Sequence, residues 1–221
     1  MQFCKSIIHF GVIGASIVAA SLPARALVVT YTDRDAFLAA LSSSSTDNYN
    51  DLSSGLVTSP LNRTITGYTY NATATDDLVL GTVNGSTVLS ANVSGKALTL
   101  NFTAGAPTAV GGYFFNTDIG FNVLNRVITV TANPGASAQS VVTGSATNFF
   151  GWLDDSGTPF TSLVIVPGAG SPDAFATVDD LVLGQAAPAA QVPGPLPVLG
   201  LVVAFSFSRR LRSRIAAARH R

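Results

Sequence analysis

Two pairs of adjacent aspartates are the residues of this sequence whose chemistry best suits a metal ion. Asp154 and Asp155 precede a Ser-Gly turn, and Asp179 and Asp180 open the segment Asp-Asp-Leu-Val-Leu-Gly. Calcium takes six to eight oxygen ligands from carboxylates and carbonyls, so both pairs are candidate ligands of a structural calcium ion. The alternative is that these carboxylates are solvated and only help the chain to turn.

Three aromatic side chains are candidates for contact with a sugar. Tyr68 and Tyr70 lie two residues apart in a β-branched run, so they share one face of an extended strand. Trp152 ends the run Asn-Phe-Phe-Gly-Trp. An aromatic ring can stack on the polarised C–H groups of a sugar face. The alternative for each ring is burial in the core, where most large apolar side chains lie.

Several kinds of catalytic site are excluded by the residue types. Residues 27–190 contain no His, Cys, Glu or Met. They therefore cannot form a Ser-His-Asp triad or a Cys-His pair, and they lack the usual ligands of zinc, haem and iron–sulfur clusters. A glycan hydrolase that uses two aspartates stays open as an alternative, because it needs only two facing carboxyl groups about 5 to 9.5 Å apart.

Charge is unevenly distributed along the chain. Residues 27–190 hold four basic residues against all 12 acidic ones, every one an Asp, which gives this region a net charge of −8. Six of the 12 basic residues lie in the last 13 positions. Nucleic acid requires a basic face, so we do not expect it as a partner of the acidic region.

Short β-branched runs separated by turn residues predict the elements that must position these side chains. Residues 97–102 alternate between polar and apolar types, as expected for a strand with one buried face. We predict an all-β domain over residues 27–184, a single antiparallel β-sandwich of the jelly-roll or galactose-binding type. We expect this domain not to be an enzyme. The predicted strands are 27–32, 63–70, 78–83, 96–102, 109–115, 126–131, 138–143, 148–153, 161–166 and 176–183.

One short helix is predicted near the start of this domain. Thr32 and Asp33 are suitable N-caps, and good helix formers follow over residues 36–41. The serine-rich residues 42–46 predict a flexible loop after the helix.

The first 26 residues have the pattern of a secretory signal peptide. Lys5 supplies a positive charge, residues 7–22 are mostly apolar, and Ala24 and Ala26 form a small-x-small cleavage site. The alternative is an uncleaved N-terminal membrane anchor.

The last residues have a three-part pattern. An Ala/Pro-rich linker over 185–191 leads to a tail over 192–221. An apolar span over 196–207 is predicted to be a helix, although a membrane-spanning helix needs about 20 residues. Basic residues at one end of such a span favour the cytoplasmic side of a membrane. The tail begins with a Pro-Gly-Pro-Leu-Pro motif, formed by Pro193, Gly194, Pro195, Leu196 and Pro197. It ends in a cluster of arginines over 209–221, which starts with Arg209 and Arg210.

This tail resembles the PEP-CTERM sorting signal of bacteria, in a variant where Pro-Gly-Pro-Leu-Pro replaces the Pro-Glu-Pro motif. The resemblance implies recognition by an exosortase in the inner membrane, transient anchoring there by the tail, and export to the cell envelope or extracellular matrix. It also implies a link to exopolysaccharide and biofilm. Residues 30–37, 111–115, 148–152 and 176–184 are similar to segments of the lectin-like ectodomains of that family.

Three functions are compatible with these patterns. The first is an exported, non-enzymatic envelope or matrix protein that binds polysaccharide. The second is a structural surface protein with no specific ligand. The third is a glycan hydrolase that depends on aspartates. Exposed aromatic rings on one face favour the first, a uniformly Thr/Ser/Asn surface the second, and a cleft with two facing aspartates the third.

Overall fold

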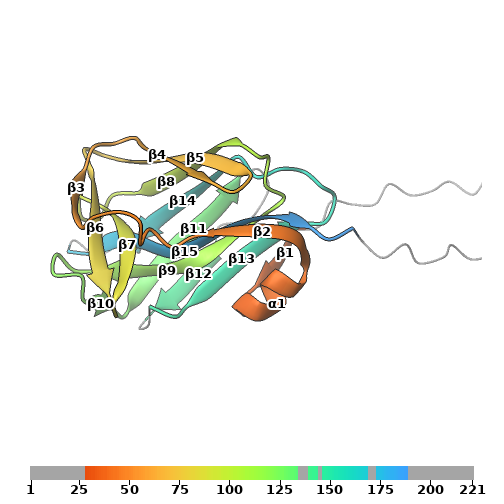
Figure 1. The fold of residues 1–221 in the computed structure, drawn as a ribbon. Helices are drawn as coiled ribbons and strands as arrows, with labels where there is room; N and C mark the ends of the chain where they lie inside the picture. The colour runs from red at the N-terminus through yellow and green to blue at the C-terminus, as the bar shows by residue number, and fades with distance from the viewer. Residues whose placement is uncertain (1–27, 134–138, 144–145, 169–172, 189–221) are drawn as a thin grey trace, which may run out of the picture.

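A computed structural model describes residues 28–133, 139–143, 146–168 and 173–188. These residues form two antiparallel sheets and one short helix (Figure 1). All strand pairs within the sheets are antiparallel, which confirms the predicted β-sandwich.

The larger sheet has nine strands and is organised around its longest one, β15. Its main path runs β1-β13-β9-β15-β7-β6-β3, while β10 pairs with β9, and β2 pairs with β15. The strands are β1 (Val28–Tyr31), β2 (Leu41–Asp47), β3 (Gly55–Val57), β6 (Leu78–Val83), β7 (Ser86–Ala91), β9 (Ala109–Thr117), β10 (Val123–Leu124), β13 (Phe149–Asp154) and β15 (Phe175–Ala186).

The smaller sheet has six strands in the order β12-β11-β14-β8-β5-β4. Its strands are β4 (Leu61–Ile65), β5 (Tyr68–Ala74), β8 (Leu98–Ala104), β11 (Arg126–Asn133), β12 (Gln139–Thr143) and β14 (Ser162–Pro167). Along β8 and β14 the burial alternates with period two, because one face of this sheet packs on the other sheet.

The main core lies between the two sheets. Both contribute buried aliphatic and aromatic side chains, among them Leu100 and Ile165 from the smaller sheet and Phe114, Trp152 and Val178 from the larger one. The Phe114 and Phe150 rings lie 6.1 and 4.8 Å from the Trp152 ring. The inner face of the larger sheet is thus buried in the main core, and its outer face is the one on which α1 packs.

A helix of six residues, α1 (Arg34–Ala39), packs on the outer face of the larger sheet, beside β1 and β13 (Figure 1). Asp33 caps it by accepting a hydrogen bond from the backbone N–H of Ala36 at 2.7 Å. Its buried side chain, Phe37, contacts the ring of Phe149 and occupies the space above Gly151, where a Cβ would lie 2.8 Å from the Phe37 ring.

A buried ion pair joins the two sheets at one edge. Asp47, the last residue of β2, is 2% exposed and accepts two hydrogen bonds from the Arg63 guanidinium of β4, at 2.9 and 2.6 Å. It also accepts a hydrogen bond of 2.7 Å from the phenol of Tyr70 on β5. The exposed Asp51 binds the same guanidinium from outside, at 2.9 and 2.8 Å.

Two sequence predictions about elements are wrong. Residues 41–47 form strand β2 rather than a flexible loop, because they pair with residues 181–186 of β15. The predicted strand 63–70 is a hairpin, in which β4 and β5 flank a turn at Gly67, whose φ is +82°. In both cases the structure follows pairing with a partner strand rather than local propensity.

The predicted signal peptide, with Ala24 and Ala26, lies outside the described residues, as does the sorting tail with Pro193 through Pro197, Arg209 and Arg210. Within the part of the chain that the structure describes, no helix has the length and apolarity required to cross a membrane.

Candidate functional site

The outer face of the nine-stranded sheet is only partly covered. Because side chains alternate along a strand, Val88 and Ser90 of β7 point to this face, whereas Leu89 and Ala91 point to the core. Helix α1 covers one part of the face, and the segment from Asp118 to Leu124 covers another. Three hollows lie on this face, next to α1 and to the segment from Asp118 to Leu124.

The ring of Phe121 is the central feature of this face. It lies directly on Gly81 of β6, where any Cβ would overlap its ring carbons. Phe121 has a φ of +61°, a conformation unusual for a residue other than glycine. The loop is held by Asp118, whose carboxylate accepts hydrogen bonds from the backbone N–H groups of Gly120 and Asn122, at 2.8 and 2.9 Å. A hydrogen bond from the Asn122 side chain, together with these two backbone hydrogen bonds, lowers the pKa of Asp118.

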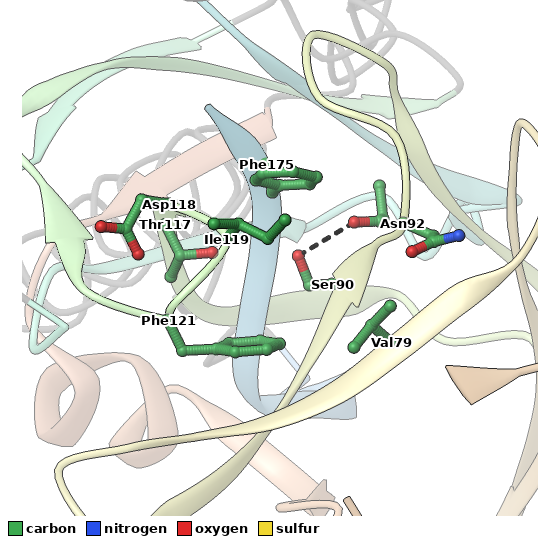
Figure 2. Close-up of a pocket in the computed structure, with 9 residues that line it drawn as sticks. Val79, Ser90, Asn92, Thr117, Asp118, Ile119, Phe121 and Phe175 are labelled. Atoms are coloured by element: carbon green, nitrogen blue, oxygen red, sulfur yellow. Dashed lines mark hydrogen bonds between the residues drawn. The ribbon is translucent and has the colours of Figure 1, made fainter. Parts of the chain in front are cut away.

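A small hollow of about 80 Å³ lies on one side of Phe121. Figure 2 shows the rings of Phe121 and Phe175 on opposite sides of it, with Ile119 and Ser90 between them. Ile119 is 87% exposed, although it is a large aliphatic residue. The hollow is lined by Val79, Ser90, Ala91, Asn92, Thr117, Asp118, Ile119, Phe121 and Phe175.

Buried hydroxyl groups form the floor of this small hollow. The Ser90 and Thr177 hydroxyls lie 3.1 Å apart, and the Thr177 and Thr117 hydroxyls lie 2.9 Å apart. This series of hydrogen bonds ends at a backbone carbonyl, because the Ser90 hydroxyl donates to the carbonyl oxygen of Ala176 at 3.2 Å. These hydroxyl groups form hydrogen bonds with one another and with the backbone, which makes the floor of the hollow rigid. Hydrogen bonds to a ligand would therefore come from residues at the rim of the hollow.

A larger and more polar hollow of about 470 Å³ lies on the other side of Phe121. It is bordered by Thr82, by Asn84 in the turn between β6 and β7, and by Asn122. Asn84 and Thr82 are exposed. The Asn122 amide donates to the Asp118 carboxylate at 2.9 Å, which orients its carbonyl oxygen away from that partner.

An apolar ring beside planar amides and hydroxyls suits a sugar. The ring can cover the C–H face of a pyranose, while amide and hydroxyl groups exchange hydrogen bonds with its hydroxyls. The volume of the larger hollow lies in the range of small-molecule sites, about 300–1,000 Å³.

Neither of the two aspartate pairs predicted to bind calcium has a further acidic side chain placed to complete a metal site among the described residues. Among residues 28–133, 139–143, 146–168 and 173–188 there is no group of three His, Cys, Asp or Glu side chains placed to hold a metal ion. Asp154 is 4% exposed and is turned toward its own loop, where it accepts hydrogen bonds from the Ser156 backbone N–H at 2.9 Å and from the Ser156 hydroxyl. Asp155 is exposed in the same turn.

Asp179 and Asp180 lie at a bulge in β15. The register with β9 shifts between Asp179 and Val182, and Asp180 has a φ of +45°. Asp179 pairs with Tyr113 of β9 and accepts a hydrogen bond of 2.8 Å from the backbone N–H of Asp180. Burial raises its pKa, against a hydrogen bond from Ser86 that lowers it. The bulge changes the partner of β15 on one side from β7 to β2.

The predicted sugar platform is wrong. Tyr68, Tyr70 and Trp152 are 7%, 0% and 0% exposed and belong to the main core. They share the inner face of their sheets, so no ligand reaches their rings. Burial raises the pKa of the Tyr70 phenol, which donates its proton to Asp47.

Sequence reasoning missed Phe121, because this residue falls between the predicted strands 109–115 and 126–131. A signal was present in the run Asp-Ile-Gly-Phe-Asn over residues 118–122. Of the two large apolar residues in this turn, Phe121 packs against the buried cluster of Val83, Val88 and Phe115, and Ile119 is exposed. Such residues are candidates for a binding surface.

Comparisons with known proteins assign no family to this chain. No family model matches this sequence, and no curated protein matches it. A mutant of a family 29 carbohydrate-binding module, studied for its ligand recognition, is similar over 59% of this chain and 92% of its own. The identity is 12% and the TM-score is 0.33, so the β-sandwich assignment rests on the strand pairing described above.

Proposed function

We propose that this protein is an exported, non-enzymatic carbohydrate-binding protein of the bacterial cell envelope or extracellular matrix. The observation that carries the binding part is the half-buried Phe121 ring between two hollows, with amides and hydroxyls at its edges. The ligand we infer is a polysaccharide, such as an exopolysaccharide of the producing cell.

The export part rests on the two ends of the chain. Residues 1–26 have the pattern of a signal peptide, and residues 192–221 resemble an exosortase sorting signal. In this proposal the tail holds the protein in the inner membrane until an exosortase acts on it. Recovery of the native protein solely from the cytoplasm would contradict this part.

The test of the binding part compares Phe121→Ala with wild type on immobilised neutral and acidic polysaccharides. We expect the full chain to bind at least one neutral polysaccharide, and Phe121→Ala to weaken that binding about tenfold or more, since it removes an apolar stacking surface. Val127→Ala is the matched control, because Val127 is a 39% exposed apolar residue on β11 of the other sheet.

Two results would contradict the binding part. One is a folded wild-type protein that binds no polysaccharide in the presence of calcium or of a chelator, which would favour a structural surface protein with no specific ligand. The other is equal loss of binding in Phe121→Ala and Val127→Ala, which would place the site elsewhere.

A further inference from the structure

A third hollow of about 270 Å³ lies on the same outer face of the nine-stranded sheet, next to α1. It is lined mainly by polar groups, among them Arg34 and Asp35 at the start of α1, Thr147, and the phenol of Tyr113 on β9. The Tyr113 ring is half-buried and packs edge-on against Phe149, with ring centres 5.7 Å apart. It therefore presents a fixed aromatic wall to the hollow.

The three hollows are linked by shared or neighbouring lining residues. Phe121 borders both the small hollow and the large one. Ala146 borders the large hollow, and its neighbour in sequence, Thr147, borders the third. Strand β9 connects the first hollow with the third, because Thr117 borders the first and Tyr113 the third, about 14 Å apart at 3.4 Å per residue.

Arg34 has donors available for a ligand. Its Nε is buried and has no hydrogen-bond acceptor among the residues that the structure describes, and no described carboxylate pairs with its guanidinium. Arg63, by contrast, binds two aspartates. The other four N–H donors of the guanidinium lie on its terminal nitrogens, and a ligand oxygen in the hollow would accept hydrogen bonds from these.

The charges around the three hollows favour a neutral ligand. Asp33 and Asp35 flank Arg34 in sequence and border the same hollow. The domain carries a net charge of −8 over residues 27–190. A polyanion would be repelled by this field, whereas the hydroxyl and ring oxygens of a neutral sugar can accept hydrogen bonds from Arg34, and its hydroxyl groups can donate to the aspartates.

We propose that the three hollows are consecutive subsites for one extended neutral polysaccharide chain, with Arg34 and Tyr113 forming the third subsite. This inference rests on the proposed carbohydrate-binding function and names its substrate class. Because a longer chain fills more subsites, affinity should rise with the number of sugar units until the three hollows are occupied.

The test uses full-length protein and ladders of cello-, laminari-, manno- and malto-oligosaccharides, from disaccharide to octasaccharide, with affinities measured by calorimetry. The variants are Arg34→Gln and Tyr113→Phe, which change the third hollow, and Phe121→Ala, which changes the first two. Lys96→Gln is the matched control, because it removes an equal charge at an exposed residue that lines none of the three hollows.

For the ladder that binds, we expect wild-type affinity to increase with length. We expect Arg34→Gln to weaken octasaccharide binding about 10- to 100-fold, the range for a hydrogen bond to a charged group, while disaccharide binding changes about twofold or less. Phe121→Ala should weaken both. Arg34→Gln and Tyr113→Phe should unfold near the wild-type temperature, and Phe121→Ala, which loses packing against Val83, Val88 and Phe115, should remain folded at the assay temperature.

The two proposals fail in different ways. Length-independent affinity, or unchanged octasaccharide binding in both Arg34→Gln and Tyr113→Phe, would overturn the third subsite and leave Phe121 as a single site. Binding of acidic polymers in preference to all neutral ladders would overturn the neutral substrate class. Absence of binding by wild type on every ladder and polysaccharide would overturn the proposed function itself.

Discussion

Replacement of Arg63 by methionine tests the ion pair between the two sheets. Methionine keeps most of the side-chain volume but removes the guanidinium, so the carboxylate of Asp47, 2% exposed, loses two hydrogen bonds and its counter-charge. Among the residues that the structure describes, only the Tyr70 phenol and the Tyr49 backbone N–H, at 2.7 and 3.2 Å, still donate to it.

The expected cost follows from leaving a buried charge without its partner, about 3–5 kcal/mol. That is a large part of the total stability of a typical domain, about 5–15 kcal/mol. At about 2–4 °C per kcal/mol for a domain of this size, we expect Arg63→Met to unfold roughly 6–20 °C below wild type. Thermal and urea unfolding followed by circular dichroism and Trp152 fluorescence measure this difference.

Asp51→Asn is the matched control, because Asp51 binds the same guanidinium from solvent and its side chain is 63% exposed. Exposed pairs contribute about 0–1 kcal/mol, so this variant should stay close to wild type. The double variant Asp47→Asn with Arg63→Met should recover part of the loss, since no buried charge remains. An Arg63→Met protein within about 1 kcal/mol of wild type would refute the reasoning.

Two further variants test other parts of the structure. Gly81→Ala adds a Cβ where the Phe121 ring lies, so we expect the ring to move and glycan binding to weaken about tenfold, with little change in unfolding temperature; full affinity would show that Phe121 is not part of the site. Asp179→Asn tests a carboxyl whose pKa is raised by burial from 3.8. The folded protein binds this proton more tightly than the unfolded chain, so wild-type stability falls as pH rises from 3.8 through the folded pKa. Asp179→Asn should therefore be the more stable protein near neutral pH and lose this advantage on acidification. Asp51→Asn should show the opposite dependence, because Arg63 lowers the pKa of Asp51 and wild type loses that contribution as pH falls. Unfolding curves between pH 3 and pH 7 test both signs, and parallel curves for the two variants would contradict them.

Strands with strong local signals were predictable from sequence. Residues 78–83 are rich in Val and Leu and precede an Asn-Gly turn, and strand β6 has the predicted bounds. The short helix and its Asp33 cap were predictable for the same reason, since capping is a local interaction. Strand β2 was not, because a run of serines has little preference of its own and extends only by pairing with β15, more than 130 residues away in sequence.

The candidate site was harder to predict because burial depends on the face of a strand. Tyr68 and Tyr70 were assigned correctly to one face, but nothing local indicates whether that face meets solvent or the other sheet. Phe121 is the reverse case, since its position is set by Gly81, 40 residues earlier. The three hollows combine residues of α1, β6, β7, β9 and β15, which the sequence does not bring together.

The central position of β15 has a consequence for the order in which the protein folds. Without residues 175–186 the larger sheet consists of separate pieces, β1-β13-β9 with β10 and β7-β6-β3, and β2 has no partner in that sheet. A ribosome delivers this strand after all others of the described domain. Two sheet edges therefore stay open during synthesis, and the domain has to complete itself in one late, long-range step.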